Sequence, residues 1–391
     1  MSKLEKLIQQ FCPDGVEYKA LGEVTIMKRG TSATKGIMQA GNIPVISGGR
    51  QPAFYCNASN RTGEVITVAG SGAGAGYVQY WNEPIFVCDA FSIQGNETLN
   101  TKYVYYVLTS IQEKIYSTKK GGGVPHVHIS SIDKFEIPVP PLPVQEEIVR
   151  VLDAFTELQA ELQAELQAEL QKRKQQYNFY RDNLLSFEGR QDVEWKKLGE
   201  IASIRTGRRF VRTDIRESGV PCFHYGDIYT YYGLTATQTR GYLDAELASK
   251  LRFAQPNDVV VVCAGENDMD LGVGVAWLGK EPAVVHDACC ILHHAQNPRY
   301  ISHFLRTHKY HLQMKKYVKN GKISSLPSSG LAEALIPIPS LEEQQRIADI
   351  LDRFDTLTNG LTSGLPAEIE KRRQQYEYYR DKLLTFKRKG A

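Results

Sequence analysis

The sequence predicts an α+β protein with two similar α/β domains, related by a pseudo-two-fold axis and joined by long antiparallel coiled-coil helices. Three observations predict this fold. The chain repeats itself internally, each copy begins with short segments rich in Val, Ile, Tyr and Gly, and each copy ends in a run with helical spacing of apolar residues. At 391 residues the chain is also long enough for two or three domains, each with its own core.

The internal repeat covers nearly the whole chain. Val16–Val24 recurs as Val193–Ile201 at an offset of 177 residues, and Lys172–Asp182 recurs as Lys371–Asp381 at an offset of 199 residues. The second copy is therefore longer by about 22 residues, most of which lie between 227 and 250. Two domains that share most positions but differ in one insert suit two related binding tasks. A duplication without functional divergence is the alternative.

Short strands are expected at the start of each copy. Apolar runs bounded by Gly or Pro predict them over 45–47, 65–69, 85–87 and 259–262. One helix is expected to follow in each copy, over 102–114 and 300–317, because large apolar residues recur there every three or four positions. Residues 1–15 resemble a long-helix end at the 177 offset, so we expect them to dock near Leu383 and Leu384 of the C-terminal helix.

A long helix is expected over 144–188, which contains no Pro or Gly. Residues 157–171 repeat the tetrapeptide Glu-Leu-Gln-Ala within it, and such a helix is about 65 Å long. The matching helix, 341–386, contains Gly360, Gly364 and Pro366, which we expect to break it. Each apolar stripe needs a partner, so we expect the helices to pack on each other. The side chains expected in this packing are Leu158, Leu162, Leu166, Leu170, Tyr177, Tyr180, Leu357, Leu361, Leu365, Ile369, Tyr376 and Tyr379.

Composition narrows the class of protein. The formal net charge is only +3, so a polyanionic partner has to be bound by local basic patches. The chain has no apolar run long enough for a membrane span and no signal-peptide pattern at its start, which predicts a cytoplasmic protein. Seven cysteines without a C-x-x-C pair predict reduced, mostly buried thiols.

Several motifs suggest chemistry, but each has a structural explanation. The Gly-rich segment Gly70–Gly76 suggests a phosphate loop, yet a tight turn between strands explains it better. Asn297–Tyr300 resembles a motif of adenine methyltransferases, but it also suits a helix cap. The Cys and His residues of 289–311 fit no standard zinc spacing. Asp89 and Asp287 occupy matched positions and could pair with a base or an Arg, but we expect them to face the core. We therefore expect no catalytic residue, no metal site and no cofactor.

Basic and aromatic residues on Gly-rich loops are typical of a surface that binds a polyanion. A solvated surface is the simpler explanation of any charge run, but these residues recur at matched positions in both copies. Arg and Lys bind phosphates or guanine edges, and Gly lets a loop enter a groove. The residues expected to bind DNA are Lys28, Arg29, Arg50, Arg61, Lys119, Lys120, His126, His128, Arg205, Arg208, Arg209, Arg212, Tyr225, Lys319 and Lys322.

Together these features resemble the specificity subunit of type I restriction-modification systems. The resemblance rests on the duplicated sequence, the proline-rich segments 137–142 and 336–341 followed by Gln145 and Gln344, the two Lys-Arg-x-Gln-Gln-Tyr helix ends, and the tetrapeptide repeat. It covers essentially the whole chain.

The resemblance implies two target recognition domains, 16–140 and 193–339, each reading one half of a bipartite, asymmetric site in double-stranded DNA. It also implies that the spacer helices 144–188 and 341–386 dock two methyltransferase subunits. Methylation of adenine N6 from S-adenosylmethionine would belong to those partners, and ATP-driven cleavage to restriction subunits. This chain would be a non-catalytic specificity subunit.

The tetrapeptide repeat then gains a physical meaning as a ruler. One repeat lengthens a helix by about 6 Å and rotates it about 40° beyond one turn, while one base pair rises about 3.4 Å. A replication-slippage scar is the alternative explanation of the repeat. Two other functions stay open: a scaffold that recruits proteins through its helix pair, and a self-sufficient methyltransferase built on Asn297–Tyr300.

Overall fold

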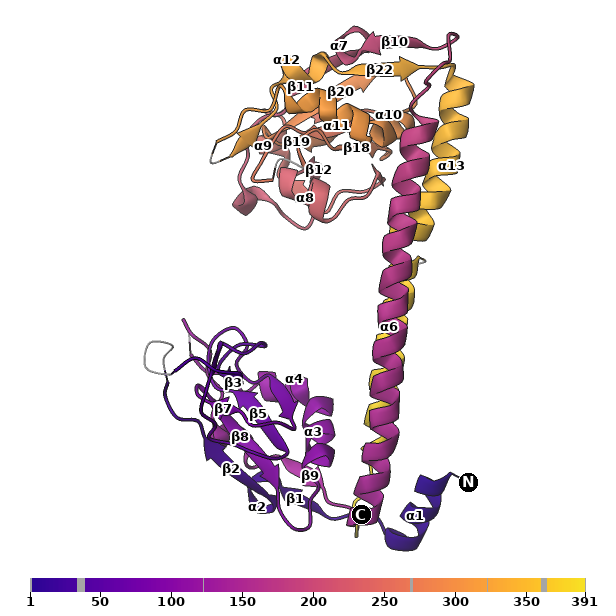
Figure 1. Ribbon diagram of the computed structural model, residues 1–391. Coiled ribbons are helices and arrows are strands. Elements are labelled where there is room, and N and C mark those ends of the chain that lie inside the picture. Colours follow the sequence, from indigo (N-terminus) through magenta and orange to yellow (C-terminus); the bar gives the residue numbers. More distant parts are fainter. Residues whose placement is uncertain are drawn as a thin grey trace. The chain divides into compact units, whose positions relative to one another are not determined.

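The computed structural model describes residues 2–33, 39–121, 123–267, 270–321, 323–359 and 364–390, and the chain divides into two units (Figure 1). Unit 1 comprises Met1–Ala164 and Glu370–Ala391, and unit 2 comprises Glu165–Ile369. Helix α6 (Leu142–Leu184) begins in unit 1 and ends in unit 2, whereas α14 (Leu365–Leu383) begins in unit 2 and ends in unit 1.

Unit 1 is built on a four-stranded antiparallel sheet with the order β2-β8-β5-β6. A three-stranded sheet, β4-β3-β7, and the pair β1-β9 complete its strands. The strands are β1 (Tyr18–Ala20), β2 (Thr25–Arg29), β3 (Ile43–Ile46), β4 (Phe54–Cys56), β5 (Val65–Ala69), β6 (Val78–Trp81), β7 (Phe86–Val87), β8 (Ala90–Gly95) and β9 (Glu136–Pro138). Its short helices are α1 (Lys3–Phe11), α2 (Leu21–Val24), α3 (Thr101–Ser110), α4 (Gln112–Tyr116) and α5 (Ile129–Ile132).

The core of unit 1 lies between this sheet and helices α3 and α4, which cover one of its faces (Figure 1). All five residues of β5 are buried, and its first four, Val65–Val68, are β-branched, which fits a central strand. Ile66 and Ile93 of the sheet join Tyr103 and Val107 of α3 in one apolar cluster.

The two ends of the chain meet within unit 1. Leu4 of α1 lies in the same apolar cluster as Ile148 of α6 and Leu384, and the Nζ atom of Lys3 pairs with Oε2 of Glu147 at 2.7 Å. The backbone N–H of Val16 donates to the carbonyl oxygen of Lys387 at 2.8 Å. The N-terminal segment thus packs where α6 begins and α14 ends.

Unit 2 repeats this plan with additions. Its main sheet has the order β11-β20-β16-β18-β13, its second sheet the order β14-β12-β19-β15, and two pairs, β10-β22 and β17-β21, complete it. The strands are β10 (Glu194–Lys197), β11 (Ala202–Thr206), β12 (Val220–Phe223), β13 (Thr235–Ala236), β14 (Gly241–Leu243), β15 (Phe253–Ala254), β16 (Val259–Val262), β17 (Ala264–Gly265), β18 (Gly274–Trp277), β19 (Ala283–Val285), β20 (Cys289–His294), β21 (Ser324–Ser325) and β22 (Leu335–Ile338). The helices are α7 (Leu198–Ile201), the 3-10 helix η1 (Arg212–Asp214), α8 (Tyr225–Thr230), α9 (Ala245–Ala248), α10 (Pro298–Phe304), α11 (His308–Lys315), α12 (Ser328–Ala332) and α13 (Leu341–Asn359).

The extra residues of the second copy extend the common plan at its edges. Residues 227–250 contain β13, β14 and α9, and β13 adds a fifth strand beside β18. Strand β14 pairs with β12. The insert therefore leaves the central strands β20 and β16 in the positions that β8 and β5 hold in unit 1.

Three helices, α6, α13 and α14, make up the long helical segments. Helix α6 has 43 residues, and the second helical run consists of α13 and α14. Gly364 and Pro366 lie at the start of α14, whereas Gly360 and Leu361 fall outside the described residues. Within unit 2, Tyr180 of α6 stacks on Phe354 of α13 with ring centroids 5.5 Å apart.

Two expectations about helices are wrong. The single helices expected over 102–114 and 300–317 are each two helices, α3 with α4 and α10 with α11. In unit 2 the break has a clear local cause, because the Thr307 side chain accepts a hydrogen bond from the backbone N–H of Tyr310 and so caps a new helix. All seven cysteines are free, and all but Cys88 are buried, as expected. Among the described residues, we find no helix with the length and apolarity needed to cross a membrane.

Candidate nucleic-acid interface

A surface cavity of about 350 Å³ in unit 1, here called cavity 1, lies where β2 ends and β8 begins. Arg29, Asp89, His126 and His128 contribute to its lining. The Ser71 hydroxyl donates a hydrogen bond to a carboxylate oxygen of Asp89. Cavity 1 therefore combines a cation, a carboxylate and two imidazole rings.

The expected turn of the Gly-rich segment is confirmed, and it shapes the wall of cavity 1. The backbone N–H of Gly76, which has a φ of +83°, donates to the carbonyl oxygen of Ala69 at 2.8 Å and closes the link between β5 and β6. The N–H groups of Gly72 and Val127 bind the carbonyl oxygens of Pro125 and Gly70, both at 3.0 Å. The turn thus holds the loop that carries His126 and His128 beside it.

Unit 2 has its own cavity of about 410 Å³, here called cavity 2. Four rings line it: Phe210, His224, Tyr225 and His286. The His224 and His286 centroids are 4.9 Å apart, and the Phe210 ring meets His286 edge-on at 5.0 Å. Burial lowers the pKa of both histidines, so both rings are neutral at pH 7.

The two cavities occupy matched places in the repeat. Each is lined by a glycine after the central strand, Gly70 or Gly265, and by an aspartate just before the next central strand, Asp89 or Asp287. The remaining linings differ, because cavity 1 contains Ser32, His126 and His128, whereas cavity 2 contains the four rings of Phe210, His224, Tyr225 and His286. One scaffold therefore presents two chemically different surfaces.

The structure brings six of the expected DNA-binding residues to these cavities. Cavity 1 contains Arg29, His126 and His128, and cavity 2 contains Arg209, Arg212 and Tyr225.

Three other expected residues of unit 1 make contacts within the domain. Arg61 donates to Ser92 Oγ at 2.7 Å and to the carbonyl oxygens of Asn60 and Arg29, so its guanidinium joins neighbouring segments. Arg50 lies over the ring of Tyr77, and Lys119 lies over the ring of Tyr116. The backbone of Lys120 pairs with that of His126, and Lys28 is exposed on β2.

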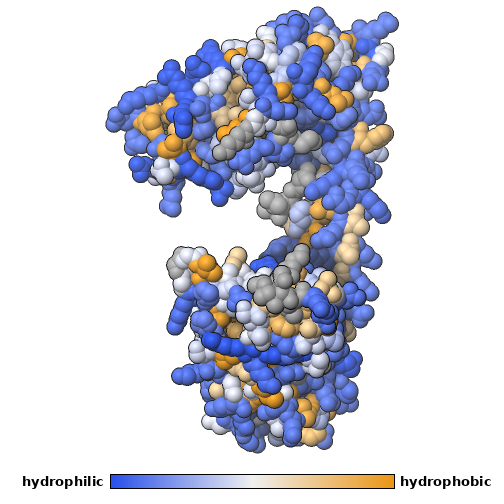
Figure 2. All heavy atoms as spheres, turned by 60° about the vertical axis from the view of Figure 1, so that its left-hand side comes forward, coloured by the Kyte–Doolittle hydropathy of each residue, from blue (hydrophilic) through white to orange (hydrophobic). Residues whose placement is uncertain are grey.

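In unit 2, Arg205 is exposed on β11, and Arg208 donates to the carbonyl oxygen of Lys250 at 2.7 Å. Lys319 pairs through its backbone with Ser325, and Lys322 lies outside the described residues. Hydrophilic residues cover most of each unit on the face shown in Figure 2, and hydrophobic residues form small separate groups there.

The expectation that Asp89 and Asp287 face the core is wrong, because both side chains are exposed at the cavities. Each aspartate follows the buried end of a strand by two residues, and the chain turns outward there. Sequence reasoning also missed Phe210, His224 and His286. The available signal was the aspartate that recurs at the same place in both copies.

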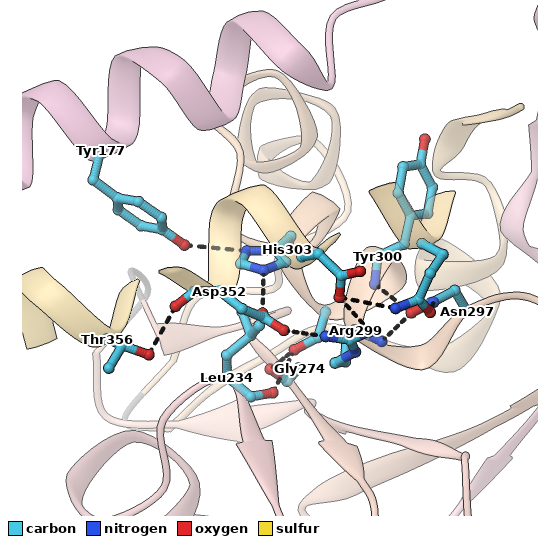
Figure 3. A network of polar contacts seen from close by, with 12 residues as sticks. Tyr177, Leu234, Gly274, Asn297, Arg299, Tyr300, His303, Asp352 and Thr356 are labelled. Carbon is cyan, nitrogen blue, oxygen red and sulfur yellow. Dashed lines mark hydrogen bonds and ion pairs between the residues drawn. The ribbon is translucent and has the colours of Figure 1, made fainter. Parts of the chain in front are cut away.

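A second repeated feature anchors each sheet domain to a long helix. In unit 2 the Asn297 side chain accepts hydrogen bonds from the N–H groups of Arg299 and Tyr300 at 3.0 and 3.1 Å, which caps α10 (Figure 3). The Asn297 N–H donates to Oε1 of Gln344 on α13 at 3.0 Å, and Nε2 of Gln344 donates to the carbonyl oxygen of Pro339 at 2.9 Å. The methyltransferase-like motif is thus a helix cap in this fold.

Unit 1 contains the same anchor at the matching positions. The Asn100 side chain accepts from the N–H of Tyr103 at 3.0 Å, and the N–H of Asn100 donates to Oε1 of Gln145 at 2.8 Å. Nε2 of Gln145 donates to the carbonyl oxygen of Pro140 at 2.6 Å. The buried glutamine after each proline-rich segment therefore has a structural role.

An aspartate on the long helix completes each anchor. Asp352 pairs with Arg299 and lies 2.8 Å from Nε2 of the fully buried His303 (Figure 3). Burial lowers the pKa of His303, and its neutral form fits these contacts, with Nε2–H donating to Asp352 and Nδ1 accepting from the Tyr177 hydroxyl at 3.1 Å. In unit 1, Asp153 accepts from Lys102 and from Tyr106 instead.

The side chains expected to pack along the long helices differ in how far they are buried. Tyr177 is buried, whereas Leu158 and Leu357 are 62% and 64% exposed. The Tyr376 hydroxyl lies 2.8 Å from that of Thr156 within unit 1. Tyr180 and Tyr379 are also exposed. Leu361 lies outside the described residues. The half-buried side chains are Leu162, Leu166, Leu170, Leu365, Ile369 and Tyr376.

Comparisons with known proteins agree on one family. The model of the type I restriction modification DNA specificity domain matches residues 13–172 and 190–371. The chain is 33% identical to the EcoR124I/EcoR124II specificity subunit of Escherichia coli, over 99% of this chain and 97% of that protein. It is 30% identical to a putative type I specificity subunit of Haemophilus influenzae, with 98% of each chain covered.

Solved structures show the same fold. A chain from a structure described as the basis of complex assembly and conformational transition of the type I R-M system matches with a TM-score of 0.67 at 18% identity, covering 95% of this chain and 98% of that chain. The HsdS subunit of Thermoanaerobacter tengcongensis matches with a TM-score of 0.50 at 18% identity, covering 96% and 97%. This chain belongs to the family of type I restriction-modification specificity subunits.

Proposed function

We propose that this chain directs a type I restriction-modification complex to its DNA site, with each unit reading one half of a bipartite, asymmetric sequence. The observation that carries the proposal is the pair of matched cavities with different linings. Two units with identical cavities would favour a symmetric DNA site, whereas two units whose cavities have different side chains favour two different half-sites. Basic residues at both cavities supply the phosphate contacts that DNA binding requires.

The chain itself is non-catalytic in this proposal. Methylation of adenine N6 from S-adenosylmethionine belongs to two methyltransferase subunits, and ATP-dependent cleavage belongs to restriction subunits. The most similar segments of the repeat, 172–182 and 371–381, support a partner that binds twice. Each segment exposes an aromatic side chain at the same position, Phe179 at 66% and Tyr378 at 62%. Equivalent exposed aromatics on two helices suit two copies of one partner.

The tetrapeptide repeats of α6 set the spacing between the half-sites in this proposal. Deleting residues 161–164 shortens the helix by about 6 Å. Because a base pair rises about 3.4 Å, the nonspecific spacer should shorten by one or two base pairs while both half-sites persist. Methylation mapping of the deletion variant checks this, and an unchanged spacer would contradict the ruler.

The main experiment maps N6-methyladenine across the genome of a strain that produces this chain with its methyltransferase. The matched control strain lacks only this chain. We expect one split, asymmetric motif to be methylated in the first strain and unmethylated in the second. If both proteins are produced and the maps are identical, the chain is a protein scaffold instead. Binding of the complex to DNA should also weaken steeply with salt, because phosphate contacts release counterions.

A further inference from the structure

The matched aspartates are unexpected on a surface that binds DNA. Asp89 and Asp287 lie at the same place in the repeat, and both are exposed at a cavity that also holds arginine. A carboxylate repels phosphate groups, so a surface that bound only the DNA backbone would not have a carboxylate in the cavity of each unit. The recurrence calls for a ligand group that donates hydrogen bonds.

Each carboxylate keeps acceptor capacity toward its cavity. Ser71 donates to one oxygen of Asp89, and a carboxylate has about four lone-pair sites. Oδ1 of Asp287 lies 3.0 Å from Nδ1 of His286, and the same Nδ1 accepts a hydrogen bond from the N–H of Ala288 at 3.1 Å. In its neutral form that ring nitrogen does not donate to Asp287. Ser71 thus orients Asp89, Asp287 lies in contact with His286, and neither carboxylate is saturated by these contacts.

The exocyclic amines of cytosine and adenine are the base groups that suit such an acceptor. Both amines face the major groove, and aspartate or glutamate accepts from them there, whereas guanine and thymine present acceptors at the same positions. Arg29 in cavity 1, and Arg209 and Arg212 in cavity 2, can hold the flanking phosphates and offset the negative charge. The shared requirement is thus an amine-bearing base beside a phosphate backbone.

We propose that Asp89 and Asp287 are specificity-determining residues, each accepting a hydrogen bond from the exocyclic amine of one base in the half-site that its unit reads. This inference rests on the proposed function and deepens it. The carboxylate is common to both units and selects an amine-bearing base. The different neighbours, Ser32, His126 and His128 in cavity 1 and Phe210, Tyr225 and two histidines in cavity 2, set the rest of each half-site.

The test compares methylation maps from strains carrying the full chain, D89N or D287N, each with the methyltransferase. Asparagine keeps the shape and can still accept from Ser71, but it presents a donor where the aspartate presents only acceptors. D89N should lower discrimination at one base position of one half-site by roughly five- to 100-fold and leave the other half-site unchanged. D287N should do the reverse. Asp14→Asn, an exposed residue outside cavity 1, is the matched control and should change no position.

Binding to modified duplexes identifies the amine. The purified complex is offered a site in which the assigned base is replaced by 2-pyrimidinone for cytosine or by purine for adenine, since both lack the exocyclic amine. The unmodified complex should lose affinity by a factor similar to the change in D89N, and D89N should lose nothing further. Ser71→Ala removes the hydroxyl that donates to Asp89 and should weaken discrimination at the same base position. This variant tests the same contact if D89N folds poorly.

The outcomes separate this inference from the proposed function. If the unaltered chain directs methylation to a split site but neither aspartate variant changes any base preference, the inference is wrong and the function stands. A uniform loss of binding across all sequences would also overturn it, because that result marks a backbone contact. If the unaltered chain directs no methylation, the proposed function itself fails.

Discussion

Replacing Asp352 by asparagine should weaken the anchor of unit 2 more than any single surface change. Asp352 accepts from Arg299 and from His303, and the histidine is fully buried. Burial alone would raise the pKa of Asp352, but hydrogen bonds from His303 and Arg299 outweigh that effect and hold the pKa below its usual range. The folded state therefore prefers the charged carboxylate that the substitution removes.

The expected loss is about 2 kcal/mol, since hydrogen bonds to a charged group contribute roughly 1.5 to 3 kcal/mol. The upper end is not expected, because Asp352 is 28% exposed and Arg299 keeps a second partner, Asp349, at 2.9 Å. Asp349→Asn is the matched control. Asp349 is 48% exposed and makes one ion pair with Arg299, so its loss should cost under about 1 kcal/mol.

Hydrogen exchange at α10 measures the difference directly. The amide of Ile301 donates to the carbonyl oxygen of Asn297 at the start of that helix, and 2 kcal/mol corresponds to roughly 30-fold faster exchange through local opening. Exchange in unit 1 should not change. Equal acceleration by D352N and D349N, or none by either, would refute the view that the buried contacts of Asp352 hold α10 on α13.

Three further predictions follow from single contacts. Phe179→Ser and Tyr378→Ser should each reduce the number of bound methyltransferase subunits from two to one, which native mass spectrometry measures; two subunits bound to both variants would contradict the docking proposal. Arg61→Ala should destabilise unit 1 by about 2 kcal/mol in urea unfolding, since it removes three hydrogen bonds, while Arg205→Ala on exposed β11 should change little. Burial lowers the pKa of His311 to about 4. Between pH 6.5 and pH 4 the unfolded chain therefore binds a proton at this residue that the folded chain does not bind, and the free energy of unfolding should fall as the pH falls through this range. Urea unfolding at pH 7.5 and 5 should show a smaller fall for His311→Gln, and equal falls would contradict this assignment.

The sequence predicted features that depend on neighbouring residues or on the repeat. Helix α6 follows from spacing alone, because no Pro or Gly interrupts it. The cap at Asn297 follows from a local preference, and the buried strand β16 follows from four consecutive valines. In each case the cause and the structure lie within a few positions of the same segment.

Features built from distant segments were beyond sequence reasoning. Cavity 2 combines Phe210, His224 and His286, which come from three different segments. Their proximity depends on the parallel pairing of β12 with β19, which no local pattern reveals. Asp89 was expected to face the core, and only the turn before β8 shows that it is exposed.

The two copies of the repeat differ in which contacts they share and which they vary. The anchor uses the same elements in both units, an asparagine cap, a buried glutamine and an aspartate on the helix, although Tyr106 in one unit is replaced by His303 in the other. Both side chains donate to their aspartate, so the anchor conserves a hydrogen bond and not a residue. The cavities differ more: a glycine and the pairs Asp89-Ala90 and Asp287-Ala288 recur in their linings, while most other lining residues change. In the proposed function, a change of lining would therefore alter the base that is read without loosening the attachment of the sheet domain to its helix.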